Sequence, residues 1–217
     1  MLTVHHLGVS QSDRIVWLCE ELGVPYEMVK YDREPSGMAP PAYRALHPAG
    51  TAPVITDGDL VLGESGAIIE YIIAKHGGGR LAVTADSPDF ADYLFWFHFA
   101  NASMLPRTMM VLILSMAGAA QSASDAGDPR TSAMAARSDQ AFAMVEERLG
   151  AAPYFAGGDF TAADIMMAFS LTTMRLFAPR DLTPYPNIQA YLQRIGERPA
   201  YRRAMMKADP DLPLQLI

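Results

Sequence analysis

The chain has 217 residues, of which 50% are hydrophobic and 19% charged, so the sequence predicts one large or two modest folded domains and excludes a disordered chain. Its formal net charge of −7 at pH 7 disfavours nucleic acid and anionic membranes as partners, because their phosphates would be repelled.

The first part of the chain alternates between strand and helix patterns. Leu2–Leu7 is short and apolar, as a buried strand would be, and apolar residues recur with helical spacing over Asp13–Leu22. Tyr26–Tyr31 alternates apolar with polar residues and predicts a second strand. These elements indicate a β-α-β unit.

A hairpin and a helix are expected next. The two strands of the hairpin, Val54–Asp57 and Leu60–Leu62, are separated by a glycine-aspartate turn signal. Ser65 is placed to cap a helix that ends at His76, before three glycines.

From Ser87 onward the sequence shows only helical patterns. The first of these helices is apolar on two sides, and Pro106 is expected to kink or interrupt it. Further helices are expected over about Pro129–Leu149, Thr161–Phe177, Asn187–Ile195 and Pro199–Lys207. Segment 117–128 is interpreted as a mobile loop. The sequence thus predicts an α/β domain at residues 1–78, a linker at 79–86 and an all-α domain at 87–217.

Several features favour a cytoplasmic protein. The N-terminus lacks the basic start and apolar run of a signal peptide, and no apolar stretch reaches the ~20 residues of a membrane span. The single cysteine, Cys19, can form no internal disulfide, which fits a reducing compartment. No metal site is expected, because the histidines lack the spacing of metal ligands.

Short motifs along the whole chain resemble the glutathione transferases. They are His5-His6-Leu7, Ser10–Arg14, Val16–Tyr26, Gly50–Val54, Glu64–Ala67 and Gly158–Ile165. The resemblance implies a thioredoxin-like first domain that binds glutathione as co-substrate. It also implies that the helical domain supplies most of the pocket for a small apolar electrophile.

A homodimer is expected on two grounds. The long helix that starts near Ser87 is too apolar on two sides for one protomer to cover both comfortably. In the resembled family the two-fold axis runs along this helix and the next, which would bury part of Phe90–Met116 against the partner.

The resemblance assigns glutathione-binding residues to two motifs. Pro53 matches a cis-proline that aims the backbone of Ala52 at the cysteine part of glutathione. Glu64 and Ser65 precede a helix, whose amides suit a carboxylate while the acid suits an ammonium, and the γ-glutamyl end of glutathione carries both groups. A capping serine beside an acid is also a common structural element.

The contacts with the glycine end of glutathione depart from the family pattern. His47 lies where the family places groups near this end, although an ordinary polar role in the loop stays open. Thr51 stands where many members carry a lysine that neutralises the glycine carboxylate, so one cationic contact is missing. Asn101–Ser103 stands where relatives often have an acidic residue. Arg33 and Arg107 are candidates to compensate.

Ser10 matches the catalytic serine of theta- and delta-like members, four residues before an arginine that corresponds to Arg14. An unperturbed thiol with a pKa near 8.5 is only ~3% ionised at pH 7. A hydrogen bond to the charged sulfur contributes about 1.5–3 kcal/mol, which together with a helix N-terminus lowers the thiol pKa by about two units. Ser12 or a backbone amide is an alternative donor, and either serine also suits a helix cap.

The pocket for the electrophile is expected to include Phe99, Met104 and Arg107, although apolar residues at helical spacing equally fit a core. The leading interpretation is a glutathione S-transferase that joins the glutathione thiolate to an apolar electrophile. Two alternatives stay open: a non-catalytic binding or interaction protein of the same fold, favoured by Thr51, and a glutathione-dependent redox protein that uses Cys19. The apolar helix face that carries Cys19 argues against the second.

Overall fold

The computed structural model describes residues 1–116 and 129–216, and the chain forms two compact units. One unit comprises Met1–Ala82 together with Arg194–Leu214, and the other comprises Val83–Gln193 and the residues after Leu214. The loop predicted at 117–128 lies outside the described residues.

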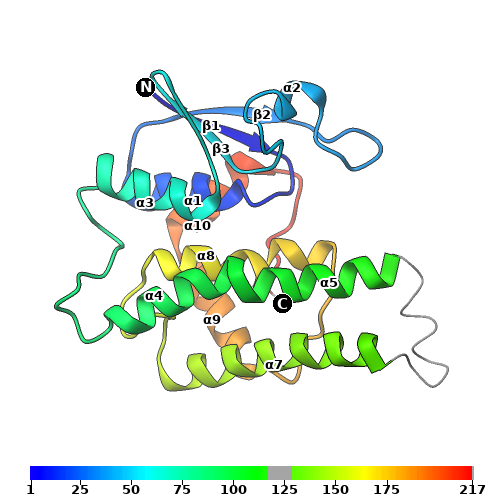
Figure 1. The fold of residues 1–217 in the computed structure, drawn as a ribbon. Coiled ribbons are helices and arrows are strands. Elements are labelled where there is room, and N and C mark those ends of the chain that lie inside the picture. The colour runs from blue at the N-terminus through cyan, green and yellow to red at the C-terminus, as the bar shows by residue number, and fades with distance from the viewer. Residues whose placement is uncertain (117–128, 217) are drawn as a thin grey trace. The chain divides into compact units, whose positions relative to one another are not determined.

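The first unit is built on a four-stranded sheet in the order β2-β1-β3-β4 (Figure 1). Its strands are β1 (Leu2–Leu7), β2 (Glu27–Tyr31), β3 (Val54–Asp57) and β4 (Leu60–Gly63). β1 pairs in parallel with β2, while β3 is antiparallel to both β1 and β4. β1 is therefore an inner strand, which explains why nearly all of it is apolar or buried.

Three helices cover one face of this sheet (Figure 1). They are α1 (Asp13–Leu22), α3 (Ser65–Lys75) and α10 (Pro199–Ala208). α10 packs along α1, with the rings of Trp17 and Tyr201 4.9 Å apart edge to face. Gly23 ends α1 in the left-handed conformation. The four-residue helix α2 (Pro41–Arg44) was not predicted.

In the described part of the second unit, the regular elements are helices. They are α4 (Phe90–Phe99), α5 (Leu105–Met116), α7 (Pro129–Ala151), α8 (Ala162–Leu171) and α9 (Pro186–Glu197). The end of α9, from Arg194, belongs to the first unit. Every residue of α8 is buried, and α4 packs against it. α8 is thus the central helix of this unit.

Two helices differ from the sequence prediction in their details. A π-helical turn, Ala100–Met104, joins α4 to α5, so the α-helical hydrogen bonding is interrupted just before Pro106, as predicted. The helix expected to run to Phe177 leaves the α conformation at Thr172, whose hydroxyl donates to the carbonyl of Ala168 at 2.7 Å. A 3₁₀ turn, Thr173–Leu176, follows. None of the helices in the described ranges is long and apolar enough to cross a membrane.

Candidate functional site

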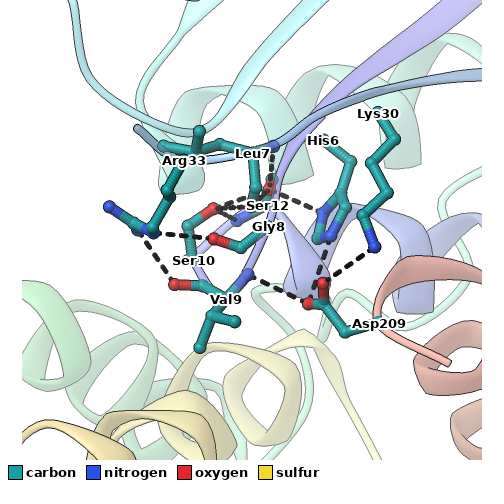
Figure 2. A network of polar contacts seen from close by, with 9 residues as sticks. All are labelled: His6, Leu7, Gly8, Val9, Ser10, Ser12, Lys30, Arg33 and Asp209. Atoms are coloured by element: carbon teal, nitrogen blue, oxygen red, sulfur yellow. Dashed lines mark hydrogen bonds and ion pairs between the residues drawn. The ribbon is translucent and has the colours of Figure 1, made fainter. Parts of the chain in front are cut away.

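The turn between β1 and α1 carries Ser10 and has an unusual backbone. Val9 adopts a φ of 50°, which is uncommon for a β-branched residue. The Arg33 guanidinium donates to the carbonyl oxygens of Gly8 at 2.8 Å and Val9 at 2.9 Å (Figure 2). It also donates to the carbonyl oxygen of Gly37 at 2.7 Å. Arg33, considered above as a compensating cation for glutathione, therefore shapes the turn on which Ser10 stands.

The two candidate serines of this turn differ in their surroundings. The Ser10 hydroxyl donates to the Leu7 carbonyl at 2.7 Å and accepts from the Ser12 amide at 3.3 Å. The Ser12 hydroxyl is fully buried and accepts from the Leu7 amide at 3.1 Å. Ser12 occupies the N-cap position of α1, but its side chain makes no capping bond, so the interpretation of Ser12 as a helix cap was wrong.

Two further residues, His6 and Asp209, continue the hydrogen bonding of this pair, and neither was assigned a role in the site from the sequence. The Ser12 oxygen lies 2.8 Å from Nδ1 of His6, and Nε2 of His6 lies 3.2 Å from Oδ2 of Asp209 (Figure 2). Burial alone would raise the pKa of Asp209, but the hydrogen bond and charge of His6, the Val9 amide and the charge of Lys30 outweigh it and lower the pKa. Asp209 is therefore a carboxylate near neutral pH.

The N-terminus of α3 forms a second polar region in the same unit. Glu64 is exposed and adopts a φ of 71°, a strained conformation for a residue with a side chain. Ser65 is the first helical residue rather than the cap, which corrects the prediction. Its buried hydroxyl donates to Gln11 at 3.4 Å and accepts from Arg14 at 3.3 Å. The first amides of a helix have no intrahelical acceptor, so they can bind an anion.

The segment before β3 has the geometry that its motif predicts. The Ala52–Pro53 peptide bond is cis. Pro53 is buried, Ala52 is half-buried and Thr51 is exposed. The ring of His47 lies so close to Gly63 that a Cβ there would come within 3.3 Å of it, and Nδ1 of His47 accepts from the Ala49 amide at 3.2 Å.

The candidate pocket residues of the second unit form a small aromatic and cationic group. Phe99 and Met104 are buried, and the guanidinium of Arg107 lies 5.8 Å from the centre of the Phe99 ring. This distance is within the range of a cation–π interaction.

Cys19 is not a competing nucleophile. It is fully buried in α1, and burial, with a smaller contribution from Glu20, raises the pKa of its thiol to about 12. Because the thiolate is the reactive form, this cysteine is inert at neutral pH. Within the described residues, no three His, Cys, Asp or Glu side chains are grouped so that they could hold a metal ion.

Comparison with known proteins matches both parts of the chain to one family. The family model of the glutathione S-transferase N-terminal domain matches residues 5–80, and that of the C-terminal domain matches residues 128–194. Glutathione S-transferase 3 of Schizosaccharomyces pombe is 33% identical over 96% of this chain and 88% of its own length. Glutathione S-transferase GstB of Escherichia coli K12 is 30% identical over 89% of this chain and 91% of its own.

Solved structures extend the similarity to the fold. A glutathione S-transferase from Actinobacillus pleuropneumoniae has a TM-score of 0.84 and 34% identity, covering 96% of this chain and 93% of that one. A theta-class glutathione S-transferase from Xanthomonas axonopodis, solved with glutathione bound, has a TM-score of 0.71 and 28% identity, covering 94% and 97%.

The chain belongs to the glutathione S-transferase family. It is a glutathione transferase with glutathione as co-substrate, which confirms the predicted fold and activity. The non-catalytic alternative gains no support from these relatives.

Proposed function

We propose that this transferase activates glutathione through Ser10 and joins the resulting thiolate to a small apolar electrophile. The observation that carries the proposal is the position of the Ser10 hydroxyl, which lies at the turn before α1 and is held by the Leu7 carbonyl and the Ser12 amide. A hydrogen bond to a charged group contributes about 1.5–3 kcal/mol, against about 0.5–1.5 kcal/mol for a neutral pair. The Ser10 proton therefore rotates from the carbonyl to a thiolate with a gain in free energy.

The γ-glutamyl end of glutathione is assigned to the start of α3. The free amides of this helix and the Ser65 hydroxyl suit its carboxylate, while the exposed carboxylate of Glu64 suits its ammonium. The strained backbone of Glu64 supports a binding role, because such strain is concentrated at functional sites. The resemblance of the Gly50–Val54 motif to the family assigns the Ala52 backbone to the cysteine part of glutathione.

The remaining assignments follow from the chemistry of each residue. His47 and Thr51 are assigned to the glycine end, where Thr51 offers a hydroxyl in place of a cation and so binds the carboxylate less tightly. Phe99, Met104 and Arg107 are assigned to the electrophile, for which the Phe99 ring offers an apolar face. We place the enzyme in the cytoplasm, which its single buried thiol supports.

In the reaction, the sulfur of glutathione first loses its proton and is held as a thiolate by the Ser10 hydroxyl. The sulfur lone pair then forms a bond to an electron-poor carbon of the electrophile, and the electrons of the bond that breaks leave with the displaced group. The protein contributes binding, orientation and ionisation of the thiol.

The proposal is tested by the Ser10→Ala variant. We expect the pKa of bound glutathione, followed by thiolate absorbance as a function of pH, to rise by about 1–2 units and turnover to fall about 10- to 100-fold, as the lost hydrogen bond requires. Ser36→Ala, which removes an exposed hydroxyl of the same unit, should change neither. If Ser10→Ala also changes neither, the donor is Ser12 or a backbone amide.

A further inference from the structure

Four side chains form a continuous hydrogen-bonded chain that begins at Ser10 (Figure 2). The oxygens of Ser10 and Ser12 are 2.8 Å apart, the Ser12 oxygen is 2.8 Å from Nδ1 of His6, and Nε2 of His6 is 3.2 Å from Asp209. His6 lies in β1 and is fully buried, whereas Asp209 follows α10, 203 residues later. The hydrogen-bonded chain thus joins Ser10 to two parts of the sequence that are far apart, strand β1 and the segment after α10.

The direction of each hydrogen bond in this chain follows from the last member. A carboxylate can only accept, so a His6 ring with a single proton carries it on Nε2 and donates it to Asp209. Nδ1 of His6 is then an acceptor, and the Ser12 hydroxyl donates to it. The Ser12 oxygen in turn can accept from the Ser10 hydroxyl. The Ser12 and His6 protons therefore point toward Asp209, and the Ser10 hydroxyl, which donates to the Leu7 carbonyl at 2.7 Å, reaches the Ser12 oxygen when it turns.

The carboxylate of Asp209 is itself held in place. Its Oδ2 accepts from the Val9 amide at 3.0 Å, and its Oδ1 lies 3.3 Å from Nζ of Lys30. Asp209, Lys30 and Arg33 are charged groups near this chain, and Asp209 is the one in contact with His6, so a proton on His6 would lie directly beside a carboxylate. The Asp209 carboxylate therefore lies where it would face the positive charge that a second proton brings to the His6 ring.

We infer that His6, acting through Ser12 and Ser10, accepts the proton of the glutathione thiol, and that Asp209 positions the His6 ring for this transfer. The thiol proton moves to the Ser10 oxygen, the Ser10 proton to the Ser12 oxygen and the Ser12 proton to Nδ1 of His6. The S–H bond breaks and its electron pair stays on sulfur. The hydrogen bonds between sulfur and Nδ1 of His6 reverse, so that Ser10 now donates to the thiolate, while Nε2 of the His6 imidazolium still donates to Asp209.

This inference rests on the proposed role of Ser10 and explains how one hydroxyl can both take the thiol proton and end as a donor to sulfur. It also assigns different tasks to the two serines, because only Ser10 meets the thiol while Ser12 connects it to His6. It makes one prediction that a purely structural role of His6 does not: the proton of the thiol stays on the enzyme.

The test compares thiolate formation with proton release when glutathione binds near pH 7. Thiolate is followed by its absorbance, and released protons are counted by calorimetry in buffers of different ionisation enthalpy. For the unaltered enzyme we expect clearly fewer protons released than thiolates formed. In His6→Gln, whose amide can still donate to Asp209 but cannot take up a proton, released protons should equal thiolates formed, and the bound-thiol pKa should rise by about one unit.

Two further variants separate positioning from folding. Asp209→Asn keeps a polar side chain of the same size but removes the charge beside His6, so it should raise the bound-thiol pKa and increase proton release. Lys207→Met breaks a different ion pair that ties α10 to Glu20 of α1, and it should change neither quantity. If both the Asp209 and Lys207 variants raise the thiol pKa equally, Asp209 serves only to attach the C-terminal segment and the inference is wrong.

The outcomes also separate this inference from the proposed function. If Ser10→Ala raises the thiol pKa while folded His6→Gln releases no more protons than the unaltered enzyme, Ser10 is the donor and the transfer to His6 is refuted. If Ser10→Ala has no effect, the proposed function fails, and the inference fails with it because the transfer passes through Ser10. If His6→Gln does not fold, the proton release of Asp209→Asn decides instead: an increase supports the transfer to His6, and no change refutes it.

Discussion

At the scale of single residues, Ser65 is buried within the fold and is also the hydroxyl that we assign to the γ-glutamyl carboxylate of glutathione. It is almost fully buried, yet its partners are Gln11 and Arg14 rather than the amides of its own helix. Both bonds are long, at 3.4 and 3.3 Å, so the hydroxyl loses little when it turns to a stronger acceptor such as a carboxylate.

Ser65→Ala should therefore weaken glutathione binding more than it destabilises the fold. The loss of one hydrogen bond to a carboxylate predicts a Kd about 10- to 100-fold higher. The two long hydrogen bonds of Ser65 within the protein contribute only about 1 kcal/mol to its stability. Calorimetry measures the first and the melting temperature the second. Ser170→Ala removes an equally buried hydroxyl from α8 and should leave the affinity unchanged. An unchanged Kd with a lower melting temperature would show that Ser65 is only structural.

The sequence predicted some residues of the site and could not predict others. Pro53 was predicted to be cis because the motif around it resembles one that carries a cis-proline in the family. Cys19 was predicted to be buried because helical spacing defines an apolar face. The contact of His6 with Asp209 carries no local signal, since the two are 203 residues apart. Arg33 was noticed only as a cation, because nothing in its neighbours shows that it binds carbonyls of a distant turn.

At the scale of elements, the start of α8 shows how a short motif organises a buried helix. Thr161 accepts from the Ala163 amide at 3.3 Å, and Asp164 accepts from the Thr161 amide at 2.8 Å, which together form a capping box. Asp164 also accepts from the amide of Phe155 at 3.0 Å and so connects the preceding loop to the helix.

Asp164→Ala should destabilise the protein by about 2–4 kcal/mol. The substitution leaves the buried amides of Thr161 and Phe155 without an acceptor, and each such group costs about 1–3 kcal/mol. Denaturant unfolding measures the free-energy difference. Asp159→Ala, at an exposed position of the same loop, should change stability by less than about 0.5 kcal/mol. A similar small effect for both would mean that the box contributes little.

Most helices and strands were predictable because they are long enough to show a period. The four residues of α2 (Pro41–Arg44) are too few for any helical spacing to appear. The junction between α4 and α5 was predictable in position, since proline cannot continue a regular helix, but the π-helical form of the turn depends on packing that sequence spacing does not encode.

At the scale of the molecule, the contacts of α10 join the end of the chain to its beginning. The bidentate pair between Arg198 and Glu21, at 2.7 and 2.8 Å, attaches the approach to α10 to α1. Such a pairing of segments cannot be seen in the sequence, where α10 simply follows other helices. It matters for function because the segment after α10 supplies Asp209.

The helical unit also leaves an apolar surface that is relevant to assembly. On α4 and α5, large apolar side chains are exposed at Leu94, Phe95, Met109, Met110, Ile113 and Met116. Exposed apolar residues gathered on neighbouring elements are typical of an interface with another protein. A second copy of this chain fits, because the net charge of −7 opposes association only weakly when the Debye length is ~8 Å at physiological salt.

We therefore expect a homodimer that buries part of α4 and α5. Sedimentation equilibrium at micromolar protein should give a mass near twice the 23.6 kDa of one chain. Phe95→Glu combined with Ile113→Glu should shift the mass toward that of one chain, because burying two unpaired carboxylates costs several kcal/mol. Met206→Glu, at an exposed apolar position of α10, is the matched control and should leave the dimer intact. A mass near 23.6 kDa that persists at high concentration would rule the dimer out.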